Sequence, residues 1–328
     1  MKEAHLKLLA CPECHGDLSL TDAEKRNDEI FSGKLSCGKC SAVYPILKNI
    51  PRFVPVDNYA SSFGLEWTRH AKTQYDSYSG AKISETRFFE ESKWDRDLKG
   101  QVILEVGSGS GRFTEQALKT GATVVSLDYC YAVEVNYASN GQNENLLLVQ
   151  GDIYKMPFKD NSFDKLFCFG VIQHTPDVKK SFMSLPRCLK SGGQIAVDVY
   201  LKLEGLKSLF ETKYWLRPIS KKMRQDTLYK FVSAYVKFMW PLACLIRKLP
   251  YGKQINWALM VADYRGKYEL PDALLMEWAI LDTFDMLSPS YDTPQTFETF
   301  RRWFDEAGLT SVEIQYGYNG IEGRARKA

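Results

Sequence analysis

The 328-residue sequence predicts an α/β protein with a doubly wound, mostly parallel sheet, a small N-terminal module and a helical insertion. Short apolar runs alternate with stretches of helical spacing between residues 99 and 200, as strands and crossover helices do. Two Cys-x2-Cys pairs precede them. The expected parts are a cysteine-rich module (1–56), a linker with leading helices (57–98), the sheet domain (99–200 and 291–328) and the insertion (201–290).

Composition limits the functional classes. A net charge of +3 implies no polyanionic partner for the whole chain, and Met1–Lys7 is too polar for a signal peptide. The longest apolar stretch, 231–246, contains Lys237 and Pro241, so it is not expected to span a membrane. A cytoplasmic protein with reduced thiols fits best. Four scattered cysteines are expected to be small buried residues: Cys130, Cys168, Cys188 and Cys244.

The segment 101–111, Gln-Val-Ile-Leu-Glu-Val-Gly-Ser-Gly-Ser-Gly, reads as a buried strand followed by a glycine-rich loop. Gly107, Gly109 and Gly111 let the backbone turn and approach a ligand closely. Helical spacing resumes at Arg112, so the loop delivers a helix N-terminus to that ligand. The loop alone is equally compatible with an ordinary tight turn.

Acids at the following strand ends make the signal more specific. Asp128 ends the next apolar strand, twenty-one residues after Gly107, close to the spacing of an acid that binds ribose hydroxyls. A dinucleotide fingerprint would need glycine at position 112, which is Arg112 here. The pattern G-x-G-x-G after Glu105 resembles motif I of the class I S-adenosylmethionine (SAM) methyltransferases, with a Rossmann-like fold.

The resemblance covers about residues 100–200 and the C-terminus. It implies SAM as the methyl donor, held by Glu105 and the three loop glycines as well as by Asp128. It further implies that Tyr129 packs on adenine, that Asp152 accepts a hydrogen bond from the adenine amino group, and that Ile153 touches the ring. In the leading helices, Phe63 and Trp67 share one helix face, which either covers the cofactor cleft or packs on the domain edge.

The N-terminal cysteines have the spacing of a closed tetrahedral metal site. Two Cys-x2-Cys turns, Cys11 with Cys14 and Cys37 with Cys40, predict a structural Zn²⁺ with four thiolates and no open position. The segment 44–55 resembles small zinc-ribbon proteins that partner tRNA and translation-factor methyltransferases. Residues 1–56 hold eight Lys/Arg and seven Asp/Glu, and four thiolates with Zn²⁺ bring the charge to −1. Such a ribbon is better suited to contact protein than RNA.

His174, in the loop after the fourth strand, is the candidate catalytic base. The alternative is a structural histidine that lines this loop. The Asn/Asp-Pro-Pro-aromatic motif of amino-directed nucleic-acid methyltransferases does not occur at this place, which argues against methylation of exocyclic base amines.

The insertion is expected to cap the edge of the sheet where acceptors bind. Residues 201–253 hold twelve Lys/Arg against three Asp/Glu, whereas 254–300 hold two against eight. The two halves either pair with each other, or the basic half faces phosphate of a nucleotide-sugar, a lipid-linked glycan or RNA. The segment 228–240 adds aromatic residues, typical of a buried lid helix or of a helix at an anionic membrane surface.

These features together favour a SAM-dependent enzyme that O-methylates a small-molecule or sugar-type (glycan) acceptor, with nucleic acid less favoured. One alternative is RNA methylation guided by the ribbon and the basic cap. The other is a non-catalytic, cofactor-binding regulatory protein that docks a protein partner through its ribbon.

Overall fold

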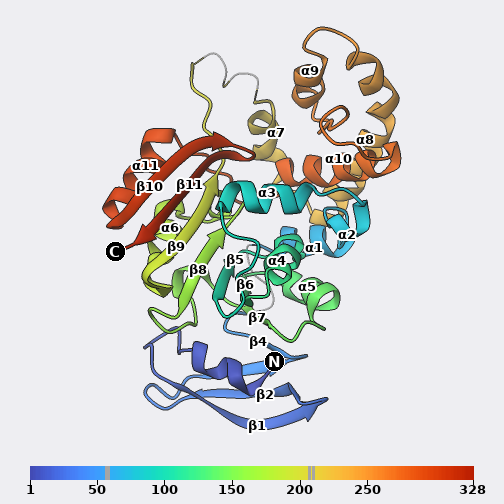
Figure 1. Cartoon of the computed structure of the whole chain (residues 1–328). Coiled ribbons are helices and arrows are strands. Elements are labelled where there is room, and N and C mark those ends of the chain that lie inside the picture. The colour runs from blue at the N-terminus through green and yellow to red at the C-terminus, as the bar shows by residue number, and fades with distance from the viewer. Residues whose placement is uncertain (56–59, 206–207, 209–210) are drawn as a thin grey trace.

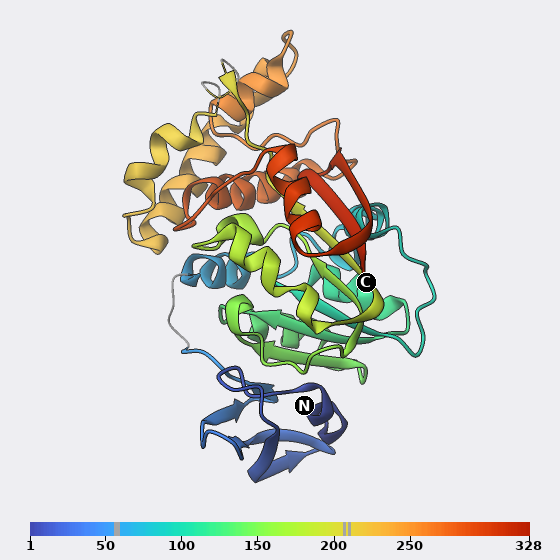
Figure 2. The same ribbon diagram turned by 90° about the vertical axis from the view of Figure 1, so that its left-hand side faces the viewer.

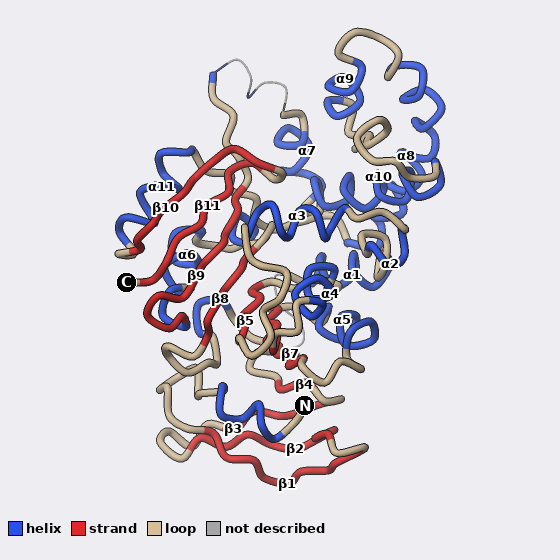
Figure 3. Tube along the Cα trace, viewed as in Figure 1, coloured by secondary structure: helices blue, strands red, loops and turns tan. Residues whose placement is uncertain are grey.

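A small N-terminal sheet, a large central sheet and a helical cap follow one another along the molecule (Figure 1). The computed structural model describes residues 1–55, 60–205, 208 and 211–328. The N-terminal sheet and the cap lie at opposite ends of the central sheet in both views (Figures 1 and 2). Figure 3 shows that strands build the first two parts, whereas the cap consists of helices and loops.

The central sheet has seven strands in the order β10-β11-β9-β8-β5-β6-β7. Strands β5 to β9 pair in parallel, while β11 runs antiparallel to both β9 and β10. The predicted doubly wound, mostly parallel sheet is therefore confirmed. The strands are β5 (Val102–Val106), β6 (Thr123–Asp128), β7 (Leu146–Gln150), β8 (Phe163–Cys168), β9 (Leu189–Val199), β10 (Leu309–Gly317) and β11 (Gly320–Lys327).

Helices cover both faces of this sheet because its central strands are apolar on both sides. Ile103 of β5 packs in one core cluster with Phe113 and Val133, and its neighbour Leu104 packs in another with Phe182 and Phe300. The first face carries α3 (Ile83–Ser92), α4 (Arg112–Lys119) and α5 (Ala132–Asn140), and the second carries α6 (Val178–Ser184) and α11 (Phe297–Glu306). The other elements of this part are α1 (Ser61–Arg69), α2 (Asp76–Ser79), and the 3₁₀ turns η2 (Ile153–Lys155), η3 (Ile172–His174) and η4 (Pro186–Cys188).

The N-terminal ribbon packs beside β7, the edge strand of the central sheet. The backbone N–H of Phe53 donates to the Gln150 carbonyl (2.8 Å), which continues the hydrogen bonding of the sheet into the ribbon. Leu9 and Ile46 of the ribbon share one apolar cluster with Phe158 of the core. The ribbon consists of η1 (Glu3–Leu8) and the antiparallel strands β1 (Leu18–Arg26), β2 (Glu29–Cys37), β3 (Val43–Leu47) and β4 (Ile50–Pro51).

The cap is built around its own apolar cluster, in which Val232 and Val236 of one helix meet Ile280 and Phe284 of another. Its helices are α7 (Lys213–Ser220), α8 (Gln225–Ile246), α9 (Gly252–Ala258) and α10 (Asp272–Leu287). Among the described residues, no helix is long and apolar enough to span a bilayer.

One of the scattered cysteines departs from the prediction. Cys130, Cys168 and Cys188 are buried as expected, but Cys244 is exposed. It lies on α8 with its side chain exposed, because no described residue buries it, although the apolar sequence around it predicted burial.

Candidate active site

The glycine-rich loop between β5 and α4 has a backbone that only glycine tolerates. Gly107 and Gly111 adopt left-handed conformations with φ of +82° and +98°. A Cβ on Gly107 would lie 2.3 Å from a methyl carbon of Val171, and one on Gly111 would lie 2.2 Å from Oδ1 of Asn136. A larger residue would therefore meet torsional strain and a steric clash together.

Glu105 lies beneath this loop and holds it from below. Its Oε2 accepts hydrogen bonds from the hydroxyls of Thr114 on α4 (2.5 Å) and Ser126 on β6 (2.7 Å). Burial raises the pKa of the Glu105 carboxyl to about 7, which the two hydroxyl donors partly counteract. The carboxyl thus joins the strand, the following helix and the neighbouring strand below the loop.

Asp128 faces the loop from the end of β6. Its Oδ2 accepts the backbone N–H of Gly109 (2.8 Å) and its Oδ1 accepts that of Cys130 (2.9 Å). Burial raises the pKa of this carboxyl above its ordinary value, and these backbone donors oppose the shift. At the next strand end, Asp152 Oδ1 accepts the N–H of Tyr154 (2.9 Å) and starts η2.

A cavity of about 840 Å³ opens between the loop, the strand ends and the cap. This volume lies at the upper end of the usual range for small-molecule sites. Of the residues predicted to bind the cofactor, five line the cavity: Gly107, Gly109, Asp128, Tyr129 and Ile153. Glu105, Gly111 and Asp152 are not among the described residues that line it.

The leading helix α1 closes one side of the cavity. Phe63 and Trp67 both line it, and a Cβ on Gly109 would lie 2.8 Å from the indole nitrogen of Trp67. Shortly after α1, the Tyr75 hydroxyl donates to the carbonyl of Ser110 (2.5 Å). Of the two roles left open for this helix face, the structure shows the one over the cleft.

His174 lines the same cavity from η3, with only 7% of its surface exposed. Its Nδ1 lies 3.0 Å from the carbonyl oxygen of Tyr291. A carbonyl only accepts, so Nδ1 carries the proton and Nε2 of the neutral ring keeps its lone pair. Phe63 and Tyr200 hold the ring edgewise, with centroids 5.1 and 5.3 Å away.

Glu66, Asp282 and Asp285 are three of the carboxyl groups that line the cavity, and none of them was among the residues predicted from the sequence to form the site. Glu66 is 1% exposed and its Oε2 has no hydrogen-bond partner among the described residues. Asp285 accepts from the Tyr200 hydroxyl (3.3 Å) through Oδ2, whereas its buried Oδ1 is likewise unpartnered there. Asp282 accepts from the Tyr264 hydroxyl. The spacing of Asp282 and Asp285 on one helix face was the available signal.

Burial is the main cause of the raised pKa of Glu66 and of Asp282. It raises the pKa of Asp282 to about 7 and raises the pKa of Glu66 well above its ordinary value. The neighbouring charges of Asp285 and Asp282 raise the pKa of Glu66 further. The cavity also contains countercharge, because Arg112 and Lys267 line it and their charges oppose the rise in the pKa of Asp282.

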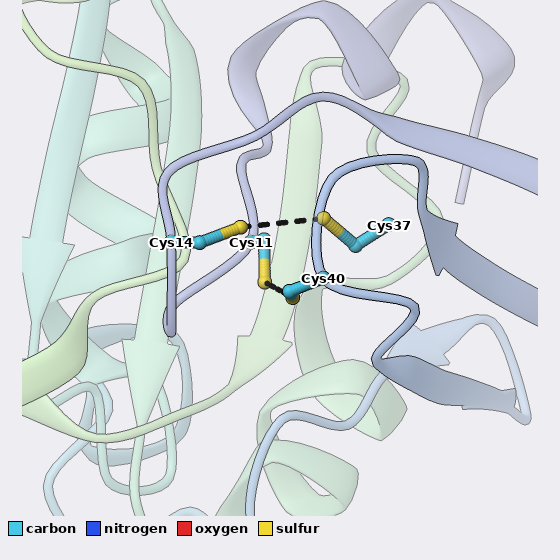
Figure 4. A group of neighbouring side chains, drawn as sticks. All are labelled: Cys11, Cys14, Cys37 and Cys40. Carbon is cyan, nitrogen blue, oxygen red and sulfur yellow. Dashed lines mark hydrogen bonds between the residues drawn. The ribbon is translucent and has the colours of Figure 1, made fainter.

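The four ribbon cysteines converge on one point from two turns (Figure 4). All their sulfur atoms lie within 4.8 Å of one another, and the Cys11–Cys40 and Cys14–Cys37 separations are 3.5 and 3.4 Å. These separations are too long for disulfide bonds. Four thiols in this arrangement fit a structural metal site.

Two family descriptions match the chain. "Methyltransferase domain" matches residues 104–197, and "Trm112p-like protein" matches residues 2–48. Demethylmenaquinone methyltransferase of Staphylococcus aureus (strain JH9) is 25% identical over 227 residues, which are 68% of this chain and 73% of that protein. Sterol 24-C-methyltransferase ERG6B of Gibberella zeae is 36% identical over 107 residues, or 31% of this chain, and the match spans only 28% of that protein.

Solved structures also resemble the chain. One is phosphoethanolamine N-methyltransferase 2 of Haemonchus contortus in complex with S-adenosyl-L-methionine, with 14% identity and a TM-score of 0.44 over 84% of this chain and 49% of that one. Another comes from a complex that contains the Haloferax volcanii Trm112 methyltransferase activator, with 14% identity and a TM-score of 0.43 over 83% of this chain and 99% of that one.

Proposed function

We propose that this chain, which carries a class I SAM-dependent methyltransferase domain behind a Trm112p-like ribbon, methylates a hydroxyl group of a small sugar-type acceptor. The observation that carries the proposal is the 3.0 Å contact between Nδ1 of His174 and the carbonyl oxygen of Tyr291. Because its Nδ1 donates to a backbone carbonyl, its Nε2 is available to accept a proton inside the cavity.

The cofactor half of the cavity would be formed by the loop and the strand ends. Gly107 and Gly109 give close backbone approach, Asp128 accepts the ribose hydroxyls, and Tyr129 and Ile153 pack on adenine. Asp152 accepts from the adenine amino group. Glu105 and Gly111 act on the shape of the loop, since Glu105 is bound to Thr114 and Ser126.

SAM, when bound, supplies an electrophilic methyl group. His174 accepts the proton of the acceptor hydroxyl at Nε2 as the new carbon–oxygen bond forms and the carbon–sulfur bond breaks. The Tyr291 carbonyl holds the imidazolium that results in its orientation. Phe63 and Trp67 exclude water, which protects the displacement from competing hydrolysis.

The chemistry of the cap side supports a hydroxyl-rich acceptor. The unpartnered oxygens of Glu66 and Asp285 accept hydrogen bonds, so an acceptor with several hydroxyl donors satisfies them. The two relatives are named for small molecules, a demethylmenaquinone and a sterol, which is consistent with a small acceptor.

For the ribbon we propose a structural Zn²⁺ and a role in protein contact. Tetrahedral Zn–S bonds of about 2.3 Å place sulfur atoms about 3.8 Å apart, close to the separations of the four cysteines. Within this chain, the ribbon contacts the central sheet domain through its edge strand β7. Thiols that must stay reduced suit a cytoplasmic location.

The test replaces His174 with glutamine and follows tritium from labelled SAM into a panel of free sugars and sugar nucleotides. Loss of the base lowers turnover by about 10²–10⁴-fold and leaves the affinity for SAM within about twofold. His70→Gln is the matched control, because His70 is also buried but does not line the cavity. A His174→Gln enzyme with full turnover would refute the base. RNA is added to the panel as a competing acceptor, and label in RNA instead of sugars would favour the RNA alternative. Binding of SAM without any transfer would favour a regulatory role.

A further inference from the structure

The cap exposes more large apolar side chains than is usual for a protein surface in contact with water. Phe238 on α8 is 80% exposed, Ile219 on α7 is 70% exposed, and Trp215 on α7 is 63% exposed. The other large apolar residues exposed on or beside α7, α8 and α9 are Leu216, Phe231, Leu242, Leu245, Leu249, Tyr251, Ile255 and Leu259. So many exposed apolar side chains on consecutive helices indicate a surface that is covered in function.

On α8 these side chains form an ordered stripe. At 100° per residue, positions 231, 238, 242 and 245 fall within about 60° of one another. The stripe is distinct from the buried face of the helix, on which Val232 and Val236 pack against α10. Lys230 and Lys237 fall roughly 100° from the stripe on its other flank, so the apolar and basic rows run side by side along the helix.

Most cations around the stripe form no ion pair within the described residues. Among the described residues of the basic half, only Lys213 and Arg217 pair with the acidic half of the cap, both with Asp292. The pairing expected between the two halves is therefore confined to these residues. On and beside α7, α8 and α9, the exposed cations that form no ion pair with a described residue are Lys221, Lys222, Arg224, Lys230, Lys237, Lys248 and Lys253.

We propose that α7, α8 and α9 form a docking surface for an anionic lipid bilayer. The apolar stripe enters the boundary between headgroups and acyl chains, and the flanking lysines meet the lipid phosphates. A second copy of the chain would bring the same uncompensated positive charge, which opposes self-association through this face. Aliphatic side chains such as Ile219 and Leu245 gain nothing from a nucleic-acid backbone.

The position of the surface also fits a membrane. Lys213 of α7 and Trp257 of α9 line the cavity, while Trp215 and Tyr251 beside them are exposed. The two helices thus contribute to the cavity and to the exposed apolar set at once. The ribbon, at the other end of the molecule, stays away from the bilayer (Figures 1 and 2).

The test is sedimentation of the full-length protein with vesicles, without cofactor or acceptor, so its outcome does not depend on the proposed reaction. Wild type should bind phosphatidylglycerol–phosphatidylcholine vesicles at low salt and bind pure phosphatidylcholine vesicles far more weakly. Phe231→Ser with Phe238→Ser, and separately Lys230→Glu with Lys237→Glu, should each weaken binding at least about tenfold.

Matched controls change the same kinds of side chain elsewhere. Tyr316→Ser removes a similarly exposed aromatic residue from β10, and Lys25→Glu with Lys82→Glu reverses two exposed lysines outside the cap. Both should bind vesicles within about twofold of wild type. The proposal fails if wild type does not sediment with anionic vesicles, or if controls and cap variants lose binding equally. It also fails if the Phe231/Phe238 variant abolishes a dimer seen by analytical ultracentrifugation while vesicle binding is unchanged.

Discussion

Arg52 ties the ribbon to the edge of the central sheet, and its removal provides a quantitative test of that junction. Its side chain is 4% exposed. Nη1 donates to Oε1 of Gln150 (2.8 Å) and Nη2 to Oε1 of Glu134 (2.7 Å). Arg52→Met removes the guanidinium and retains a long apolar stem.

The magnitude follows from what each partner loses. Gln150 is fully buried, so leaving its side-chain oxygen Oε1 without a hydrogen-bond donor costs about 1–3 kcal/mol. The pair with Glu134, which is 43% exposed, adds less than about 1 kcal/mol. Arg52 Nε has no hydrogen-bond partner among the described residues, and its removal offsets part of the loss. We expect a net decrease of about 2 kcal/mol in the free energy of unfolding.

Urea unfolding followed by circular dichroism measures this decrease. Lys48→Met is the matched control, because Lys48 contacts the same Glu134 (3.4 Å) with a side chain that is 69% exposed. This control should lie within about 0.5 kcal/mol of wild type. The reasoning is refuted if Arg52→Met lies within that margin too, or if both variants are destabilised alike.

Two further perturbations test the loop and the ribbon. The buried carboxyl of Glu105 has a pKa raised to about 7, so the folded state retains a proton that the unfolded state loses at lower pH. The stability that this group contributes is present below its ordinary pKa and is lost as pH rises to about 7. In cofactor-free urea titrations, the free energy of unfolding of Glu105→Gln should therefore rise relative to that of wild type by up to about 3 kcal/mol between pH 4.5 and 7.5. Parallel curves of unfolding free energy against pH would contradict this. In the ribbon, Cys14→Ser should lower the bound zinc measured by mass spectrometry and expose the ribbon to proteolysis. The control Cys244→Ser changes an exposed cysteine far from the cluster and should leave the zinc content and the protease resistance unchanged. Full zinc content in Cys14→Ser would exclude the four-thiolate site.

The sequence was sufficient wherever function depends on local pattern. Buried strands, the glycine spacing around Gly107 and the paired cysteines each follow from a few neighbouring residues, and the structure contains the predicted sheet and the cysteine cluster. The exposed Cys244 shows the limit: α8 is apolar around most of its circumference, and only tertiary packing decides which side is covered.

The residues that form the acceptor half of the cavity could not be predicted from local sequence patterns. Glu66, Tyr200 and Asp285 come from a leading helix, a strand end and the cap, and only the fold brings them together. The tautomer of His174 depends on the carbonyl of Tyr291, which lies 117 residues away in the chain. Contacts of this range leave no trace in the spacing of residues.

Calorimetric titration with SAM tests the central claim most directly. Wild type should bind one equivalent, and Asp128→Ala should weaken binding at least about 100-fold, because the carboxylate that both holds the Gly109 N–H and accepts the ribose hydroxyls is gone. Asp164→Ala is the control, since Asp164 caps the start of β5 outside the cavity and should leave the affinity unchanged. Absence of binding by the wild-type protein, or equal affinity of Asp128→Ala, would contradict the account.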